Sequence, residues 1–429
     1  MIEIVDIILL FFIFFLFISG PISAYSSNVS NIKISNNINL YLNLLINMNI
    51  LLYISLFPLK LSNYILIFYI VLILFFIKNY FLKFNFNNLI GNFYYFIIFF
   101  VLYFIISIDV STQLNLSWDS KWFWYIKSLY YYQDNTYREL ISYTYNDFHP
   151  HFGSYIWAFF RKMSINEYEY FGRLFYVFLY LGSLLFISLS IFKNKFLNLI
   201  VFIILVVLNY KYYYFSGLQE VLIFSLLIII SKLILIYLKN KNFIYLFSIA
   251  LAINLIIWIK SEGIAYFFIT VLCINFIRKL NFDHRIKFNI FTIGLFILKL
   301  FVFKVFDINL NNQPYYIGYI LSLDLNILIN KIMNISIYLF YYSITNIIFI
   351  LIPIILLFNY KNLIKEEFNR INIYFLVLNI IFIYFAYIFR DMEVVYSLKT
   401  TIDRLIFSSS GFYILFILNY IKNLSSKII

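Results

Sequence analysis

The sequence is poor in charge, histidine, glycine and cysteine. Only 12% of its 429 residues are charged and 64% are hydrophobic, whereas a soluble domain has about a quarter charged and about half apolar residues. The single cysteine, Cys273, excludes an intramolecular disulfide and a cysteine-based metal site. The P-loop, GxGxxG, HExxH and GxSxG patterns are also missing. The composition predicts an integral membrane protein.

The formal net charge is +13, which by itself would suggest a nucleic-acid partner. The positions of the basic residues argue against that partner, because they lie in short segments between long apolar runs. The first run, 7–18, follows Glu3 and Asp6 rather than a basic segment, so it does not resemble a cleaved signal peptide.

Apolar runs long enough to cross a bilayer recur along the whole chain. A transmembrane helix needs about 20 mostly apolar residues. We therefore expect an all-α polytopic membrane protein with about 13 transmembrane helices, in which residues 1–90 form an N-terminal group of about three spans and 91–429 form the main module. The expected spans are 4–20, 39–57, 61–77, 91–108, 171–192, 196–210, 219–238, 243–259, 263–277, 288–306, 332–358, 371–389 and 405–421.

The loops between these runs alternate in charge. Short basic loops are predicted to be cytoplasmic by the positive-inside rule, and they are 78–83, 193–195, 239–241, 278–287, 361–370 and the tail after 421. The other set is predicted to face outside, and it comprises 109–170, 211–218, 260–262, 307–331 and 390–404. All five tryptophans fall on this outer side or at its interface, so we expect the chemistry there.

The longest predicted outer loop, 109–170, is too aromatic for a disordered segment. In "WDSKWFWYIKSLYYY" (118–132), apolar residues are spaced by three and four, which predicts a helix lying in the membrane surface. A second aromatic stretch, "HPHFGSYIWAFF" (149–160), is expected to be re-entrant, with Pro150 and Gly153 as breaks before it.

Four elements occur in order along 105–425: the Trp-Asp pair of the outer loop with "HPHFGSYIW", then "SGLQEVLIF", "WIKSEGIAYF" and "TTIDRLIFSSSGF". Together they resemble the GT-C superfamily of integral-membrane glycosyltransferases. The bacterial branch that modifies lipopolysaccharide and O-antigen is the most similar.

The resemblance implies an inverting glycosyltransferase of the inner membrane, with its active face outside the cytoplasm. Nucleotide sugars are cytoplasmic, so the donor would be a polyprenyl-phosphate sugar, and the acceptor a lipid-linked glycan or another surface molecule. Partners would be membrane lipids, with no nucleic acid. Some members of the superfamily need a divalent cation and others do not, so the cofactor stays open.

Asp119 and Glu220 are the candidate catalytic residues. Glycosyl transfer to a hydroxyl needs a base, and a carboxylate in a partly desolvated aromatic setting suits that task. Asp119 could instead be a helix N-cap, since Asp is favoured there. Glu220, at the outer end of a span, could hold the acceptor or assist the base, or simply favour a helix N-terminus.

Four basic residues are candidates for binding the donor phosphate, because Lys and Arg neutralise phosphate and Arg can do so bidentately. The alternative is ordinary loop charges in salt bridges or snorkelling to the interface. These residues are Lys127, Arg173, Lys260 and Arg404.

Further candidates for substrate binding are Trp118, Trp122, His149, His151 and Glu262. Glu262 follows Lys260 in a three-residue turn, where both could be only turn residues. We expect His149 and His151 to be solvated imidazoles in a proline turn, although both could instead join Asp119 at a metal.

Two other functions remain open from the sequence. An O-antigen polymerase or ligase should have its longest loop late in the chain, with Arg-rich loops. A lipid or polysaccharide transporter should carry charges and helix breaks near mid-membrane, whereas most spans here are apolar at mid-depth.

Overall fold

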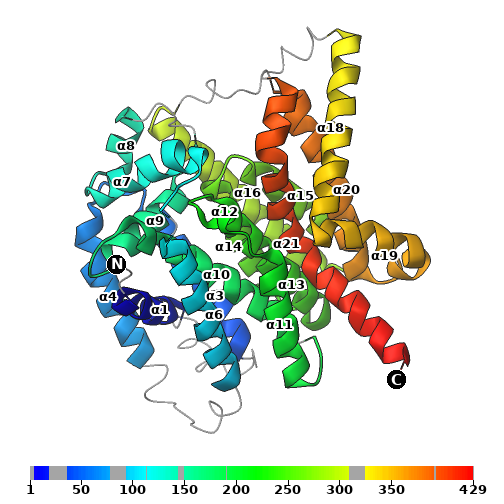
Figure 1. The fold of residues 1–429 in the computed structure, drawn as a ribbon, viewed down its shortest axis with the longest axis horizontal. Helices are drawn as coiled ribbons and strands as arrows, with labels where there is room; N and C mark the ends of the chain where they lie inside the picture. Colours follow the sequence, from blue (N-terminus) through cyan, green and yellow to red (C-terminus); the bar gives the residue numbers. More distant parts are fainter. Residues whose placement is uncertain are drawn as a thin grey trace. The chain divides into compact units, whose positions relative to one another are not determined.

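The computed structural model is all-helical over the residues that it describes, which are 4–18, 36–77, 93–112, 114–143, 149–189, 191–308, 324–390 and 393–428 (Figure 1). The chain divides into two compact units. The first contains residues 1–190, 194–222 and 258–261, and the second contains 191–193, 223–257 and 262–429. These units do not follow the predicted boundary at residue 90, because the first helices pack on helices that follow that boundary.

The first unit is built on an aromatic core. Helix α1 packs on α6 and α10, and α9 packs on α10, where the rings of Phe160 and Phe175 stack with centroids 4.5 Å apart. A Cβ on Gly172 would lie 2.1 Å from the carbonyl oxygen of Trp157, so only glycine permits this approach of α9 and α10. Its helices are α1 (Ile4–Ile18), α3 (Asn36–Ile54), α4 (Leu61–Phe76), α6 (Phe93–Thr112), η2 (Ser120–Tyr125), α7 (Ile126–Tyr132), α8 (Tyr137–Tyr143), α9 (Phe152–Lys162), α10 (Glu169–Ser188), α11 (Lys195–Asn209) and α12 (Tyr212–Phe215).

The boundary between the two units lies between residues 222 and 223, within the first turn of α13. Gly263 begins α15 directly against α14, since a Cβ there would lie 2.1 Å from the Ile256 carbonyl oxygen. Asn281 caps α16 by accepting a hydrogen bond from the Asp283 amide. The helices are α13 (Glu220–Asn240), α14 (Phe243–Ile259), α15 (Gly263–Asn275), α16 (Phe282–Val305), α18 (Leu325–Thr345), α19 (Ile347–Leu363), α20 (Glu367–Ile388) and α21 (Val394–Ile428).

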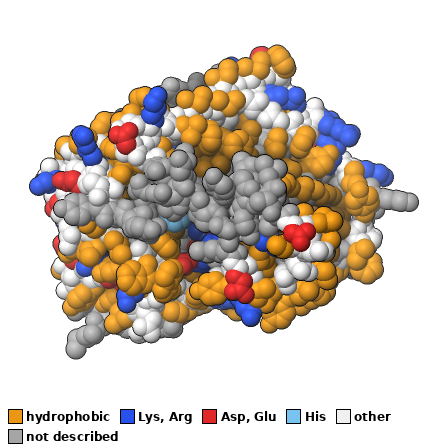
Figure 2. All heavy atoms as spheres, turned by 90° about the horizontal axis from the view of Figure 1, so that it is seen from above, with side chains coloured by type: hydrophobic (Ala, Val, Ile, Leu, Met, Phe, Trp, Pro, Cys, Tyr) orange, Lys and Arg blue, Asp and Glu red, His pale blue; other side chains and the backbone are white. Residues whose placement is uncertain are grey.

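Seven of the described helices are long and apolar enough to cross a membrane: α6, α10, α13, α16, α18, α20 and α21. Hydrophobic side chains cover much of the face shown in Figure 2, and large ones such as Leu357 and Phe358 are 84% and 80% exposed. A soluble monomer rarely exposes so much contiguous apolar surface. The chain therefore has the character of a membrane protein, while the full count of 13 spans stays a prediction.

Two predicted segments were wrong. The run 332–358 is not one helix: it is divided at Asn346, whose backbone is extended and whose side-chain oxygen accepts hydrogen bonds from the Ile348 and Phe349 amides. This asparagine ends α18 and caps α19. The stretch 390–404 is not a loop either, because α21 already begins at Val394 and carries Arg404.

A hydrogen bond in the second unit joins two segments of the predicted outer set: Lys331 donates to the Arg390 carbonyl (3.0 Å). In the first unit, the Ser62 amide, at the start of the predicted span 61–77, donates to Asp134 (2.9 Å). Tyr95, at the start of the predicted span 91–108, donates to the Lys195 carbonyl (2.7 Å). The alternation of the loops stays a prediction. The predicted loop 78–83 and most of 307–331 lie outside the described residues.

Candidate functional site

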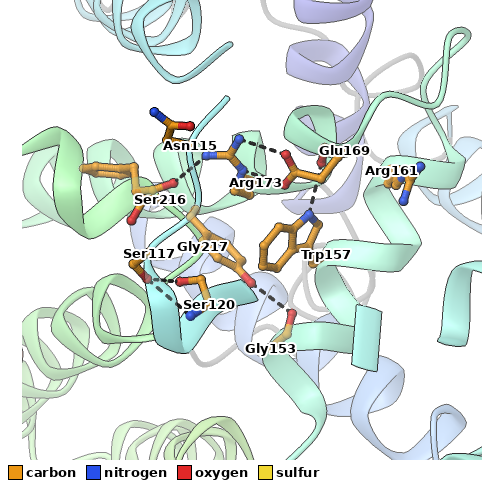
Figure 3. Close-up of polar contacts among 12 residues, drawn as sticks. Asn115, Ser117, Ser120, Gly153, Trp157, Arg161, Glu169, Arg173, Ser216 and Gly217 are labelled. Atoms are coloured by element: carbon orange, nitrogen blue, oxygen red, sulfur yellow. Dashed lines mark hydrogen bonds and ion pairs between the residues drawn. The ribbon is translucent and has the colours of Figure 1, made fainter. Parts of the chain in front are cut away.

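Two sequence elements separated by about 100 positions meet in the first unit (Figure 3). The Ser117 amide donates to the Ser216 carbonyl at 3.2 Å. Gly217 has φ +90°, and a Cβ there would lie 2.6 Å from the Trp157 ring and 2.9 Å from the Ser120 Cβ. The "SGLQE" segment thus rests directly on the "SWDS" segment, and glycine is required at the contact.

Asp119 lies half-buried at the start of the predicted interfacial helix. Its backbone is helical (φ −59°, ψ −39°) and its side chain makes no capping hydrogen bond. Ser117 does the capping instead, because its Oγ accepts from the Ser120 amide at 3.3 Å and its carbonyl accepts from Lys121. Because Ser117 and not Asp119 caps this helix, the alternative in which Asp119 is only a helix cap is not supported.

The predicted helix 118–132 is present, and its first part is a π-helix, η2, that continues as α7. π-Helical turns are rare and are frequent at functional sites. Trp118 and Trp122 are 67% and 53% exposed, whereas Trp124 is buried. The first two tryptophans are available to a ligand or a lipid, and the third is part of the core.

Glu220 and Lys260 form a buried ion pair. The Lys260 Nζ lies 2.9 Å from the Glu220 Oε1, and the two residues are 9% and 1% exposed. Glu220 is in the first turn of α13 and Lys260 directly follows α14. The sequence predicted both residues but expected Lys260 to act with Glu262. Glu262 belongs to the second unit.

Lys127 and His149 extend this cluster. The Lys127 Nζ donates to the His149 carbonyl at 2.6 Å, and the His149 Nδ1 lies 3.2 Å from the Ser261 Oγ. Ser261 follows Lys260 in the chain, so these contacts link the long loop to the turn that carries the ion pair. Asp119 enters through its segment, because its neighbour Ser120 lies against Gly217, three residues before Glu220. We call Asp119, Lys127, His149, Glu220 and Lys260 the loop cluster, since these contacts bring their segments together.

His151 does not belong to the loop cluster. It is fully buried, with its ring 4.2 Å from the Tyr137 ring and 5.5 Å from the Trp258 ring, and its Nε2 lies 2.7 Å from the Ser55 Oγ. The expectation of a solvated imidazole was wrong, and the surroundings are those of a packed core residue. Within the described residues, no group of three His, Cys, Asp or Glu could hold a metal ion.

Arg173 positions the "SGLQE" segment. Its guanidinium is fully buried, binds the Glu169 carboxylate bidentately (2.8 and 3.0 Å) and donates to the Phe215 carbonyl at 3.0 Å (Figure 3). A guanidinium engaged in this way is a poor candidate for phosphate. The sequence did not predict this role, because Glu169 was not among the residues it singled out.

Arg404 lies in the second unit. It is 4% exposed and is carried by α21, the helix whose Thr401 Oγ1 lies 2.7 Å from the Tyr387 hydroxyl. Arg404 is therefore a buried helix residue, whereas the sequence predicted it at the end of an outer loop.

The sequence missed Asp109. It lies near the end of α6, and the Tyr210 hydroxyl donates a hydrogen bond to its carboxylate. Its position at the end of a predicted span, directly before the long loop, was the signal that could have identified it.

Comparison with protein-family models, with curated proteins and with solved structures finds no match to this chain. The similarity to the GT-C superfamily therefore rests on the sequence elements alone.

Proposed function

We propose that this protein is a membrane glycosyltransferase that transfers a sugar from a polyprenyl-phosphate donor to a lipid-linked glycan or another surface acceptor. The observation that carries the proposal is the loop cluster. Residues from three separate segments, which the sequence singled out independently, converge there through the Ser117–Ser216, Glu220–Lys260 and His149–Ser261 contacts.

Asp119 is the proposed base. It takes the proton of the acceptor hydroxyl while that oxygen bonds to the anomeric carbon, and the bond between that carbon and the phosphate oxygen breaks. The departing polyprenyl phosphate carries the negative charge. Attack from the face opposite the phosphate inverts the anomeric configuration.

Lys260 is the proposed cation for the departing phosphate, and Glu220 holds it in place. An ammonium fixed by a buried carboxylate is pre-organised, so little side-chain entropy is lost when the phosphate binds. Arg404, which belongs to the second unit, stays a separate candidate for binding a phosphate. The exposed rings of Trp118 and Trp122 suit the isoprenoid chain or the sugar face, since both present apolar C–H surfaces.

The test supplies purified protein with polyprenyl-phosphate sugars and membrane glycolipids, and follows both the loss of donor and the new glycosidic product. We expect Asp119→Asn to reduce product formation by at least about a hundredfold, the usual contribution of a general base. Asp324→Asn is the matched control, because Asp324 is an exposed acid whose side chain makes no capping hydrogen bond.

Full activity of the Asp119→Asn protein would remove Asp119 as the base. If no lipid-phosphate sugar is consumed, the enzyme class is wrong. Substrate movement across vesicles without a glycosidic product would indicate a transporter instead.

A further inference from the structure

Helices α15, α20 and α21 pack against one another in the second unit (Figure 1). Tyr266 of α15 lies against Phe382 of α20, with the ring centroids 5.8 Å apart, and its hydroxyl donates to the Leu405 carbonyl of α21 at 3.3 Å. Two turns further along α15, Cys273 donates to the Ile371 carbonyl of α20 at 3.9 Å. One face of α15 therefore contacts both of the other helices.

Each of the three helices brings a polar side chain to this contact. Thr270 lies between the two contact residues of α15, four positions after the first and three before the second, so it shares their face. Asn379 follows Phe375 by four residues on the same face of α20, and the Phe375 ring lies 5.7 Å from the Tyr413 ring of α21. Thr270, Asn379 and Tyr413 are all fully buried.

The packing of the protein does not satisfy these side chains. Within the described residues, the hydroxyls of Thr270 and Tyr413 and both amide atoms of Asn379 make no hydrogen bond. The Asn379 amide and the Tyr413 hydroxyl are close enough to interact, but not in hydrogen-bonding geometry. Each side chain lies near the middle of the span that the sequence predicts for its helix, where an unsatisfied polar group is most costly.

The chemistry of these groups suits a small neutral ligand. A hydroxyl both donates and accepts hydrogen bonds, and a carboxamide does both through separate atoms. Thr270, Asn379 and Tyr413 carry no charge, so an ion would lose its hydration shell without gaining an opposite charge. Water binds inside proteins where two to four polar groups converge, and it bridges polar groups that are too far apart for a direct hydrogen bond.

We propose that Thr270, Asn379 and Tyr413 form an internal binding site for water between α15, α20 and α21, at the middle of the predicted membrane spans. The bound water gives the three helices a shared set of hydrogen bonds in a contact that is otherwise apolar and aromatic. The site is independent of the proposed transferase activity.

Hydroxyl-radical footprinting of the purified protein by X-ray radiolysis tests the site without any substitution. Radiolysis of a bound water labels the side chains beside it, even where bulk solvent does not reach. We expect Tyr413 to be labelled several-fold faster than Tyr180, an equally buried tyrosine whose hydroxyl donates to the Val206 carbonyl at 2.8 Å. Labelling of Tyr413 as slow as that of Tyr180 would overturn the proposal.

Thermal unfolding of two hydroxyl deletions gives a second test. Thr270→Val and Tyr413→Phe each remove a partner of the water with little change of shape, so we expect each to lower the Tm by about 2 °C. A dry, unsatisfied hydroxyl would give the opposite sign, because its removal stabilises the protein. Thr292→Val is the matched control, since that buried hydroxyl bonds to the Phe288 carbonyl of its own helix, α16, and its loss should change the Tm little.

The double variant Thr270→Val/Tyr413→Phe shows whether the two hydroxyls bind the same water. They make no direct hydrogen bond to each other, so coupling between them requires a common neighbour. We expect the double variant to lose less Tm than the sum of the two single losses. Additive losses, or a raised Tm in either single variant, would overturn the proposal.

Discussion

At the residue scale, Gly217 determines how closely the "SGLQE" and "SWDS" segments of the first unit can approach. Its φ of +90° is accessible to glycine at little cost, and its Cα faces both Trp157 and Ser120. An added methyl group would be strained in its own backbone and would collide with a buried ring. The contact between "SGLQE" and "SWDS" therefore requires glycine, which has only a hydrogen atom as its side chain, at position 217.

We expect Gly217→Ala to lower the free energy of unfolding by about 2 kcal/mol or more, because positive φ and overpacking both add to the cost. Thermal unfolding in detergent micelles measures the change. Gly294→Ala is the control, since nothing lies within 4 Å of a Cβ there and the position is helical, so that variant should be neutral or slightly more stable. Equal stability of the two variants would contradict the described packing.

The buried pair of Glu220 and Lys260 gives a second residue-scale prediction. Removing one partner leaves a buried charge uncompensated, which costs about 3–5 kcal/mol. We expect Glu220→Gln and Lys260→Met each to be strongly destabilising, and the double variant to lose much less than the sum. A double-mutant cycle on the free energy of unfolding measures the coupling, and additive effects would show that the two side chains do not interact.

At the element scale, Asp134 joins α4 to α9 through contacts with Ser62 and Lys162 that we call the Asp134 clasp. Asp134 forms an ion pair with Lys162 (2.7 Å) and accepts a hydrogen bond from the Ser62 amide. Burial alone would raise the pKa of Asp134, but Lys162 and Ser62 together lower the pKa below its ordinary value. The clasp is therefore fully stabilising above the ordinary Asp pKa of about 3.9 and weakens as pH falls through the lower, folded-state pKa.

We expect hydrogen exchange at residues 61–63 and 133–137 to accelerate below about pH 4, after correction for intrinsic exchange. The Asp134→Asn protein should exchange quickly there at neutral pH and respond little to acid. An acid response in the variant as large as in the wild type would assign the effect to another group.

The sequence predicted some elements well because their signals are local. Spacing by three and four indicated the helix 118–132, and a short polar stretch between apolar runs indicated the turn at 260–262. It failed at Asn346, where one side chain caps a new helix inside an apolar run. The partners of Lys260 and Arg173 could not be predicted. Glu220, the partner of Lys260, is 40 residues away in the sequence. Glu169, the partner of Arg173, is four residues away but belongs to none of the sequence elements that indicated function.

At the scale of the whole molecule, the decisive question is which end of the helices faces the cytoplasm. The excess of Lys and Arg in the short basic loops predicts that these loops face the inside. The proposed chemistry depends on this assignment, because a lipid-linked donor is required only where nucleotide sugars are absent.

The single, buried cysteine makes the orientation directly testable. In a Cys273→Ala background, Lys121→Cys in η2 and Lys365→Cys before α20 place one thiol at an exposed position in each set of loops. We expect a membrane-impermeant maleimide to label Lys121→Cys in intact cells and Lys365→Cys only after permeabilisation, with no labelling of the cysteine-free parent. The reverse pattern would place the loop cluster in the cytoplasm. A soluble nucleotide sugar could then reach Asp119, and the argument for a polyprenyl-phosphate donor would no longer hold.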